Sequence, residues 1–252
     1  MRSRLLMQPG KAVAALAITG ALALLAACAG PTAVVDPAVY RQAIDSPVRT
    51  AADREADAGR KPLEFLQFAG VRPGDKVLDM AAGAGYTSEL LALAVGPNGK
   101  VWAQVSKASP RLEERLAAHP DPVLQVLVRP FDDPYPADAP KLDLVTLIMN
   151  YHDISYLPVD RAKMNRRVFE SLRPGGHFVI IDHSTKPGAG ISQAKTLHRI
   201  EEKTVRDELQ QAGFVLENES DFLRNPADPR EQAFSDMKGV ASDKFALRFL
   251  RP

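Results

Sequence analysis

From residue 76 onward, short apolar segments alternate with longer segments of helix length, and this alternation constrains the fold more than any other feature of the chain. Such an order is typical of βαβ units, which place their strands in one mostly parallel sheet with helices on its faces. Strands are expected at residues 76–81, 100–106, 123–127, 142–149, 177–182, 214–220 and 244–249, and helices at residues 49–59, 62–69, 87–94, 111–118, 161–172 and 199–212.

The position of a ligand site follows from this arrangement. Residues 142–149 form a continuous apolar run, which indicates a strand buried on both faces. Open sheets of this kind bind ligands at the carboxyl ends of their strands, near the point where the strand order reverses. The residues just after each strand are therefore the candidates for function.

The amino terminus has the pattern of an export signal. Three basic residues, Arg2, Arg4 and Lys11, precede residues 12–27, which are almost wholly small or apolar and carry no charge. This run is shorter than the roughly 20 residues that a transmembrane helix needs, which favours a cleaved signal. The run ends in Leu-Ala-Ala-Cys28, which resembles the lipobox of bacterial lipoproteins, where the cysteine is lipidated and becomes the first residue of the mature chain.

This resemblance divides the chain into a signal peptide at residues 1–27, a tether at 28–48 and a domain at 49–252. It implies a membrane contact through a lipid on Cys28, at the periplasmic face of a bacterial cell envelope. Ala29 stands where an Asp would retain a lipoprotein at the inner membrane, and so favours the outer membrane. Because Cys28 is the only cysteine, no intrachain disulfide can form.

The charge of the chain argues against a nucleic-acid partner. The full chain has 32 Lys and Arg against 31 Asp and Glu, and loss of three basic residues with the signal leaves 29 against 31. The mature part would be slightly acidic, and no basic block remains that could follow a phosphate backbone. Nothing in the sequence indicates an oligomeric state.

Residues 79–85 form a glycine-rich turn between the first expected strand and the next helix. Glycine there permits positive φ and close approach of the backbone to a ligand, while the helix amino terminus offers free N–H groups. The segment resembles motif I of class I S-adenosylmethionine (SAM)-dependent methyltransferases, an acidic residue followed by three glycines at alternate positions. Asp79, Gly83 and Gly85 match this motif, and Ala81 replaces its first glycine.

Further segments resemble the same family in the same order. Residues 96–100 resemble the turn before its second strand, residues 143–147 its fourth strand, and Leu-Arg-Pro-Gly-Gly at 172–176 the turn before its fifth strand. The resemblance covers about residues 60–252. It implies an α/β, Rossmann-like, doubly wound sheet of seven mostly parallel strands with an antiparallel last strand, preceded by N-terminal helices. Residues 150–153 and 223–228 also resemble bacterial proteins known only as predicted methyltransferases.

The resemblance implies SAM as cofactor and a small molecule as methyl acceptor. Family members have an acidic residue after the second strand that binds the ribose hydroxyls, but residues 101–107 contain none, so Gln104 or Ser106 would take this place. Asp132 matches the family position that contacts the adenine amino group. The residues expected to bind the cofactor are Asp79, Ala81, Gly83, Gly85, Ser106, Asp132 and Asn150.

Three histidines are expected to converge on the carboxyl edge of the sheet. His152 and Asp153 follow the fourth strand, Asp182 and His183 follow the fifth, and His198 begins the next helix. A histidine has a pKa near neutrality and suits a general base, so His152, Asp153 and His183 are the predicted catalytic residues. Two alternatives remain open: His152, His183, His198 and Asp182 could bind zinc or iron, although their spacing matches no tight metal signature, or the side chains could only hydrogen-bond the backbone.

Three classes of function are compatible with these patterns. The preferred one is a SAM-dependent methyltransferase with a small acceptor in the cell envelope. A non-catalytic lipoprotein that uses the fold as a binding module is the alternative, favoured by the missing ribose carboxylate and by the cytoplasmic origin of SAM. A metal-dependent hydrolase is the third.

Overall fold

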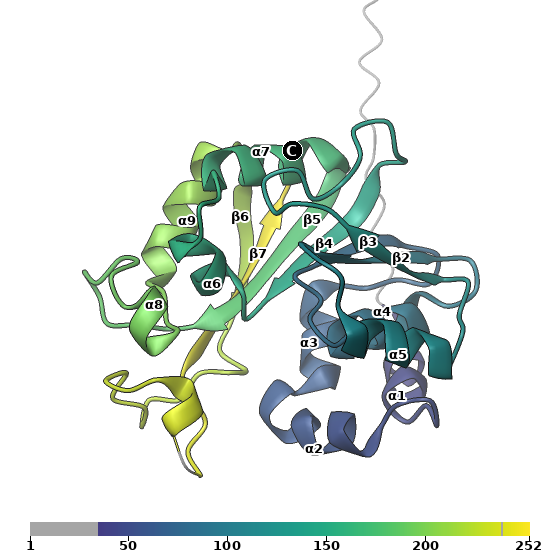
Figure 1. Ribbon diagram of the computed structural model, residues 1–252, viewed down its shortest axis with the longest axis horizontal. Coiled ribbons are helices and arrows are strands. Elements are labelled where there is room, and N and C mark those ends of the chain that lie inside the picture. The colour runs from purple at the N-terminus through teal and green to yellow at the C-terminus, as the bar shows by residue number, and fades with distance from the viewer. Residues whose placement is uncertain (1–34, 238) are drawn as a thin grey trace, which may run out of the picture. The chain divides into compact units, whose positions relative to one another are not determined.

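A computed structural model describes residues 35–237 and 239–252, which contain one seven-stranded sheet (Figure 1). The strand order is β3-β2-β1-β4-β5-β7-β6. Strands β1 to β5 pair in parallel, and β7 is antiparallel to both of its neighbours, as expected. The strands are β1 (Lys76–Met80), β2 (Lys100–Val105), β3 (Leu124–Val128), β4 (Leu142–Ile148), β5 (Leu172–His183), β6 (Val215–Ser220) and β7 (Lys244–Leu250).

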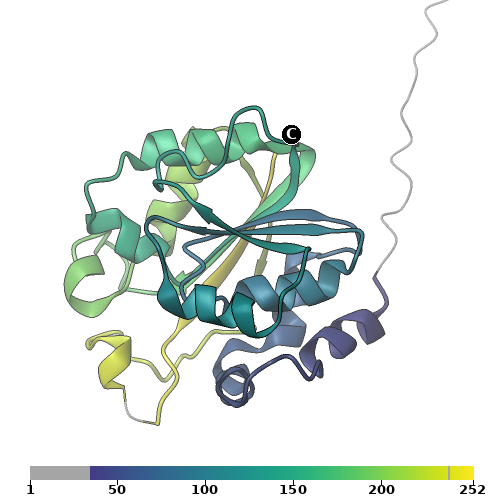
Figure 2. The ribbon, with the colours of Figure 1, turned by 45° about the vertical axis from the view of Figure 1, so that its right-hand side comes forward.

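Helices cover both faces of the sheet (Figures 1 and 2). Helices α1, α3, α4 and α5 contribute side chains to the core on one face, and α7 and α9 to the core on the other. The helices are α1 (Pro37–Ile44), α2 (Ala51–Arg60), α3 (Pro62–Ala69), α4 (Tyr86–Val95), α5 (Pro110–Ala118), α6 (Tyr151–Tyr156), α7 (Arg161–Ser171), α8 (Ala194–Leu197) and α9 (Glu202–Gln211).

The central strands are apolar because both of their faces are covered. Along β4, Leu144 packs into the core beside α4, and the next residue, Val145, packs into the core beside α7. Along β1, Val77 and Leu78 divide between the two cores in the same way. Burial of one such side chain stabilises the fold by about 1.5–3 kcal/mol, so these strands fix the sheet on which the site is built.

The domain begins earlier than the predicted boundary at residue 49. Residues 37–44, assigned above to the tether, form α1, which begins with Asp36 as a side-chain cap and Pro37 in its first turn. Tyr40 is buried, and its hydroxyl donates to the carbonyl of Val71 at 2.8 Å. A helix of two turns with mixed composition gives too little periodicity to be recognised in the sequence.

Two short helices at the carboxyl edge were also not predicted. They are α6, which carries His152, and α8, which ends at His198. His198 therefore does not begin the helix after β5, as expected from the sequence, but lies at the end of α8 with a left-handed φ of 52°. This placement turns its ring toward α6 (ring centroids of His152 and His198, 5.5 Å).

The segment between β6 and β7 is fixed to the domain by a buried ion pair. The side chains of Arg199 and Asp228 are 0 % exposed and meet at 2.8 Å. Arg199 also donates to the carbonyl oxygens of Ser184 and Gln232. This arrangement holds the segment that carries Phe234 against the end of β5, next to the histidines.

The predicted signal peptide at 1–27, the lipidation site Cys28 and the first residues of the tether lie outside the described residues. Among the helices of residues 35–237 and 239–252, none has the length and apolar character to span a bilayer.

Candidate functional site

The glycine-rich turn joins β1 to the first residue of α4. Ala81 has φ 53°, Gly83 φ 58° and Gly85 φ 87°, so all three have left-handed backbone conformations. A residue with a Cβ pays about 1–2 kcal/mol for this conformation, and Ala81 does so where the family motif has glycine. The turn thus keeps the alternating backbone geometry of the motif despite the substitution.

Asp79 lies beneath this turn and does not line a cavity. Its side chain is 1 % exposed, and its carboxylate accepts hydrogen bonds from Ser88 Oγ at 2.5 Å and from Thr146 Oγ1 at 2.7 Å. Burial raises the pKa of Asp79 to about 6, against the hydroxyl hydrogen bonds that lower it. Asp79 therefore links β1, α4 and β4, and its predicted contact with a cofactor has no support in this geometry.

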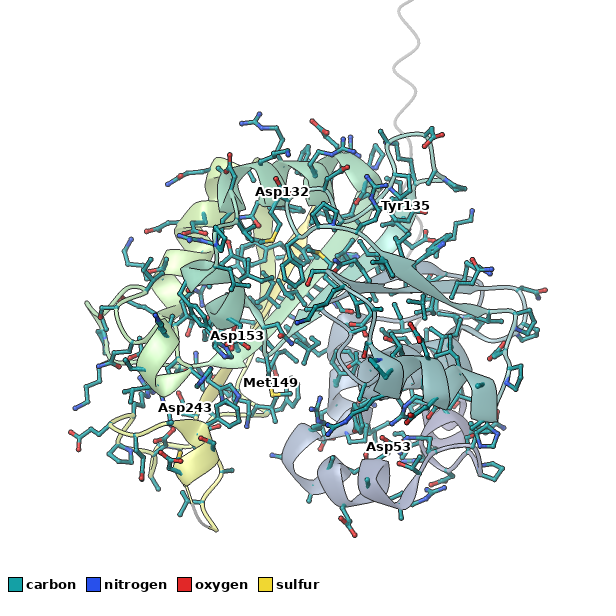
Figure 3. The ribbon with its side chains drawn as sticks, in the orientation of Figure 1. Asp53, Asp132, Tyr135, Met149, Asp153 and Asp243 are labelled. Atoms are coloured by element: carbon teal, nitrogen blue, oxygen red, sulfur yellow. The ribbon has the colours of Figure 1, made fainter. Side chains whose placement is uncertain are left out.

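An open cleft of about 480 Å³ lies at the carboxyl ends of β1, β2 and β4. Four of the predicted cofactor residues line it, which are Ala81, Gly83, Ser106 and Asn150. Asp132, labelled in Figure 3, does not line it but pairs with Lys163 of α7 at 2.8 Å. Its neighbour Phe131 lines the cleft instead. The other lining residues are Val105, Lys107, Ala108, Ser109, Pro110 and Arg111.

The residues after β2 present the hydroxyl of Ser106 and the cation of Lys107 to this cleft, and α5 adds the cation of Arg111. Gln104 is fully buried, accepts from the Ala81 N–H at 3.0 Å and donates to the Arg129 carbonyl at 2.7 Å, so it braces the turn and is not available to a ligand. Among the residues that the structure describes, those lining the cleft include Lys107 and Arg111 but no Asp or Glu that could bind the ribose hydroxyls. Of the two candidates for the ribose contact, only Ser106 remains.

Gly85 serves the packing of two helices. A Cβ at this position would lie 2.7 Å from Leu112 Cδ1 and 3.1 Å from Arg115 Cδ, both in α5. Gly85 is also absent from the lining of the cleft. The prediction that Gly85 lets the backbone approach a cofactor is therefore not supported, because the close neighbour is the protein itself.

A second, narrow pocket of about 20 Å³ lies between the start of α4, the end of β4 and the first residues of α3. Arg60 and Lys244 reach it, and burial lowers the pKa of both side chains. Met149 lines it with a left-handed φ of 56°, next in sequence to Asn150 of the cleft. The rest of its lining is mostly apolar and consists of Gly59, Pro62, Phe65, Tyr86, Thr87, Ile148, Ile181 and Leu223.

The histidines converge at the carboxyl edge, as predicted. The ring centroid of His152 lies 5.7 Å from that of His183 and 5.5 Å from that of His198. His152 is 1 % exposed, and its Nδ1 lies 2.6 Å from Asp182 Oδ1. Burial disfavours a charged His152, but the carboxylates of Asp153 and Asp182 outweigh burial and raise its pKa to about 9.

His183 has the opposite environment. Its Nδ1 lies 2.7 Å from Ser242 Oγ, and its ring stacks on Phe234 with centroids 4.1 Å apart. Burial, followed by the charge of Lys244, lowers the pKa of His183 to about 2. His183 is thus a neutral packed ring, and a base of such low pKa is weak.

Asp153, rather than Asp182, faces the free side of the histidine cluster. Its Oδ1 lies 3.2 Å from His152 Nε2 and 3.0 Å from His198 Nδ1. Asp182 is fully buried, with its oxygens engaged by the backbone N–H groups of His152 and His183 and by the His152 ring. Figure 3 labels Asp153 and Met149, which both lie beyond the carboxyl end of β4.

With this geometry established, comparisons with solved structures identify the fold. The described domain resembles a SAM-dependent methyltransferase from Aquifex aeolicus, with a TM-score of 0.61 and 18% identity over 86% of this chain and 100% of that one. A putative methyltransferase from Haloferax volcanii, solved with its Trm112 activator, gives a TM-score of 0.57 and 19% identity over 86% and 99%. The chain has the class I methyltransferase fold.

Within this fold, sequence similarity to curated proteins is partial. The ubiquinone/menaquinone biosynthesis C-methyltransferase UbiE of Burkholderia multivorans is 33% identical over 122 residues, which are 46% of each chain. The match thus spans less than half the length of that relative. The 1,6-didemethyltoxoflavin-N1-methyltransferase of Burkholderia thailandensis shares the fold with a TM-score of 0.50 and 18% identity over 84% of each chain. No protein-family profile matches the chain.

Several residues that line the cleft and the narrow pocket were not predicted from the sequence. Phe131 precedes the predicted Asp132 by one position, and Lys107 follows the correctly predicted Ser106, so both loops were identified but not every lining residue within them. Arg60 and Lys244 come from segments 184 positions apart that only the folded sheet brings together. A basic residue at the start of the last strand was the one available signal for Lys244.

Proposed function

We propose that this protein is a SAM-dependent methyltransferase. The proposal rests on the 480 Å³ cleft, which is lined by the left-handed backbone at Ala81 and Gly83 and opens at the carboxyl ends of β1, β2 and β4. This is the place where a doubly wound sheet binds a nucleotide-like ligand, and the volume suits one.

The lining residues fit such a cofactor with one change from the family pattern. The turn backbone would hold its amino-acid part, Ser106 its ribose, and Phe131 the flat face of its adenine. Ser106 Oγ can both donate and accept, so it can replace one of the two hydrogen bonds that a carboxylate would accept. When bound, the cofactor supplies an electrophilic methyl group.

The methyl acceptor is proposed to be a small molecule that enters from the side of the narrow pocket. Met149 lines this pocket and the next residue, Asn150, lines the cleft, so a group held in the pocket would lie beside the cleft at this point of the chain. At about 20 Å³, the pocket admits only the reacting end of a molecule without rearrangement. Arg60 and Lys244 favour an acceptor with an anionic or electron-rich oxygen there, and the apolar lining favours a hydrophobic body.

Catalysis in this proposal depends mainly on alignment. Methyl transfer needs the acceptor atom, the methyl carbon and the leaving sulfur in line, and good positioning alone can supply several kcal/mol. The predicted base is narrowed to His152 with its neighbour Asp153, because His183 is packed against Phe234 and Ser242. His152 Nε2 is the ring nitrogen that remains without a hydrogen bond, and it can accept a proton only while the ring is neutral and no ion is bound to it.

We also propose that the protein acts at the periplasmic face of a bacterial envelope, anchored by a lipid on Cys28. The basis is the sequence alone: three basic residues, an uncharged small and apolar run, and a cysteine at the end of a lipobox-like tetrapeptide. Ala29 favours the outer membrane.

The cofactor proposal is tested by calorimetric titration of the full-length chain, in mild detergent, with SAM and S-adenosylhomocysteine. We expect one saturable site. Phe131→Ala should weaken binding about tenfold or more, because stacking of a base on an aromatic ring contributes about 1–3 kcal/mol. Phe169→Ala is the matched control: Phe169 is also half-buried but packs against Phe214, away from the cleft.

Absence of binding by the parent chain would refute the cofactor proposal, as would equal weakening by both variants. Transfer of a labelled methyl group to an envelope extract then tests for an enzyme. Tight binding without any transfer to such an extract would favour the binding-module alternative.

A further inference from the structure

A second cluster of potential ligand atoms lies outside the cleft, where α6 meets the end of α8. His152 Nε2, Asp153 Oδ1 and His198 Nδ1 all lie within 4.8 Å of one another. His152 and Asp153 are adjacent in the first turn of α6, and His198 arrives from a segment 45 residues later in the sequence. The convergence is therefore a product of tertiary structure.

His152 is held in one orientation by a buried carboxylate. Asp182, 0 % exposed, meets the Nδ1 of His152 at 2.6 Å and accepts from its backbone N–H at 2.8 Å. This pairing directs the other ring nitrogen, Nε2, toward Asp153. A histidine that is fixed at one nitrogen by a carboxylate and presents the other is the arrangement found behind metal-binding histidines.

The Nε2 of His152 has no hydrogen-bond partner within residues 35–237 and 239–252, although its ring is 1 % exposed. Asp153 Oδ1 is only 3.2 Å away, yet the two atoms do not meet in hydrogen-bonding geometry. An unpaired buried polar atom costs about 1–3 kcal/mol. His152 Nε2 and Asp153 Oδ1 thus lie close together without a hydrogen bond between them, as two ligands of one metal ion would.

The distances agree with a metal ion. Ligands about 2.1 Å from an ion lie roughly 3.0 Å apart in octahedral and roughly 3.4 Å apart in tetrahedral geometry. The two edges at Asp153 Oδ1 measure 3.2 Å to His152 Nε2 and 3.0 Å to His198 Nδ1, and the second is also a hydrogen bond. Two imidazoles and one carboxylate suit a divalent first-row transition metal, and such triads leave coordination positions open.

The surroundings support this assignment. His198 has a left-handed φ of 52°, which costs a residue with a Cβ about 1–3 kcal/mol and is a form of strain that clusters at functional sites. Phe234 stacks on the ring of His183 and meets the rings of His152 and His198 edge-on, with centroids 6.5 Å and 6.0 Å away. Tyr156 donates to Asp153 Oδ1 at 2.9 Å and orients it. The side chains of Asp153 and His198 are 35 % and 39 % exposed, so one side of the cluster faces solvent.

We propose that His152 Nε2, Asp153 Oδ1 and His198 Nδ1 bind one divalent first-row transition metal ion, with Asp182 as the residue that orients His152. The open positions of such an ion would accept water or an oxygen atom of a substrate. This site differs from the four-residue set expected from the sequence, because Asp153 replaces Asp182 as a ligand and His183 is excluded.

The test uses the full-length chain without a histidine tag, stripped with a chelator and titrated with Co²⁺ and Zn²⁺ alone. We expect one ion per chain by calorimetry and a visible Co²⁺ spectrum that Zn²⁺ abolishes. His198→Ala should weaken binding at least tenfold, with unchanged circular dichroism because His198 is partly exposed. Asp182→Asn should weaken it about 10- to 100-fold by loosening His152.

Two control variants make the test specific. His119→Ala removes an exposed histidine at the end of α5 and should leave the affinity unchanged. His183→Ala, provided that circular dichroism shows it to be folded, should also retain the ion. Failure of the parent chain to bind one ion at micromolar concentration would overturn the proposal, as would an equal loss in His119→Ala and His198→Ala. Neither result bears on SAM binding, since the metal alone is the probe.

Discussion

The carboxylate of Asp79 is enclosed by protein, with the hydroxyls of Ser88 and Thr146 as its hydrogen-bond partners. The sequence motif implies that Asp79 contacts a ligand, but in the structure its carboxylate connects β1 to α4 and β4. Sequence similarity identifies which position is acidic, but only packing decides which way its oxygens face. Gln104 illustrates the same point, because both ends of its amide are engaged by backbone on either side of β2.

Asp79 should make the stability of the fold depend on pH. Burial raises its pKa to about 6 in the folded chain, above the ordinary 3.8, so the folded state binds this proton more tightly. The contribution of the protonated group is complete below about pH 4 and is lost as the pH rises through about 6. In Asp79→Asn, the amide can hydrogen-bond the hydroxyls of Ser88 and Thr146 without a charge. The unfolding free energy of this variant should therefore fall less than that of the parent as the pH rises from 4 to 7.

The measurement is urea unfolding of both proteins between pH 4 and 7. The difference in unfolding free energy should shift in favour of the variant by up to about 3 kcal/mol, since one pKa unit corresponds to about 1.4 kcal/mol. Parallel pH profiles for parent and variant would show that the Asp79 carboxyl is not perturbed by burial.

At the scale of elements, the long and regular segments were predictable. Helix α3 has the predicted bounds, and all seven strands overlap their predicted ranges, although β5 begins at Leu172 rather than at residue 177. The signal is clearest in β1 and β4, which are covered on both faces, whereas β6 is largely exposed. The short helices α1, α6 and α8 were not predicted, since one or two turns that pack through a few residues lack periodicity. The site depends on two of these, so its location could be predicted but not the atoms that face one another.

The turn between β1 and α4 offers a pair of substitutions with separable effects. Both Gly83 and Gly85 have positive φ, so an alanine at either adds about 1–2 kcal/mol of backbone strain. At Gly83 the added methyl would lie 3.9 Å from the Ala81 carbonyl oxygen, without a clash, and would border the cleft. Gly83→Ala should therefore weaken SAM binding about tenfold, or 1.4 kcal/mol. At Gly85 the methyl would lie 2.7 Å from Leu112, so Gly85→Ala should instead cost about 1–3 kcal/mol more in stability through overpacking.

Calorimetry and urea unfolding on the two variants separate these effects. The expected pattern is a binding defect in the first variant and a larger stability defect in the second. The reverse pattern would place the ligand at Gly85, as the motif alone suggests.

For the molecule as a whole, the proposed anchor predicts where the protein is found. Cys28→Ser removes the only thiol and with it the atom that a lipid would be attached to. We expect the variant to leave the membrane fraction or to remain unprocessed, and to lose incorporation of labelled palmitate. Immunoblots of fractionated cells and metabolic labelling measure this. Thr32→Ala, which changes a residue near the cysteine, is the control and should be anchored and labelled like the parent. If Cys28→Ser is still retained in the membrane fraction and labelled, the lipoprotein proposal is wrong.

The insertion of β7 between β5 and β6 also dictates the order in which the sheet can be assembled. Strand β6 is synthesised before β7 but pairs with no other strand, so it stays unattached until residues 244–250 have emerged. Until then β5 has one open edge, and the last piece to arrive is an interior one. The sheet therefore cannot grow from one edge to the other in the order of the sequence, because its outermost strand β6 must wait for the interior strand β7.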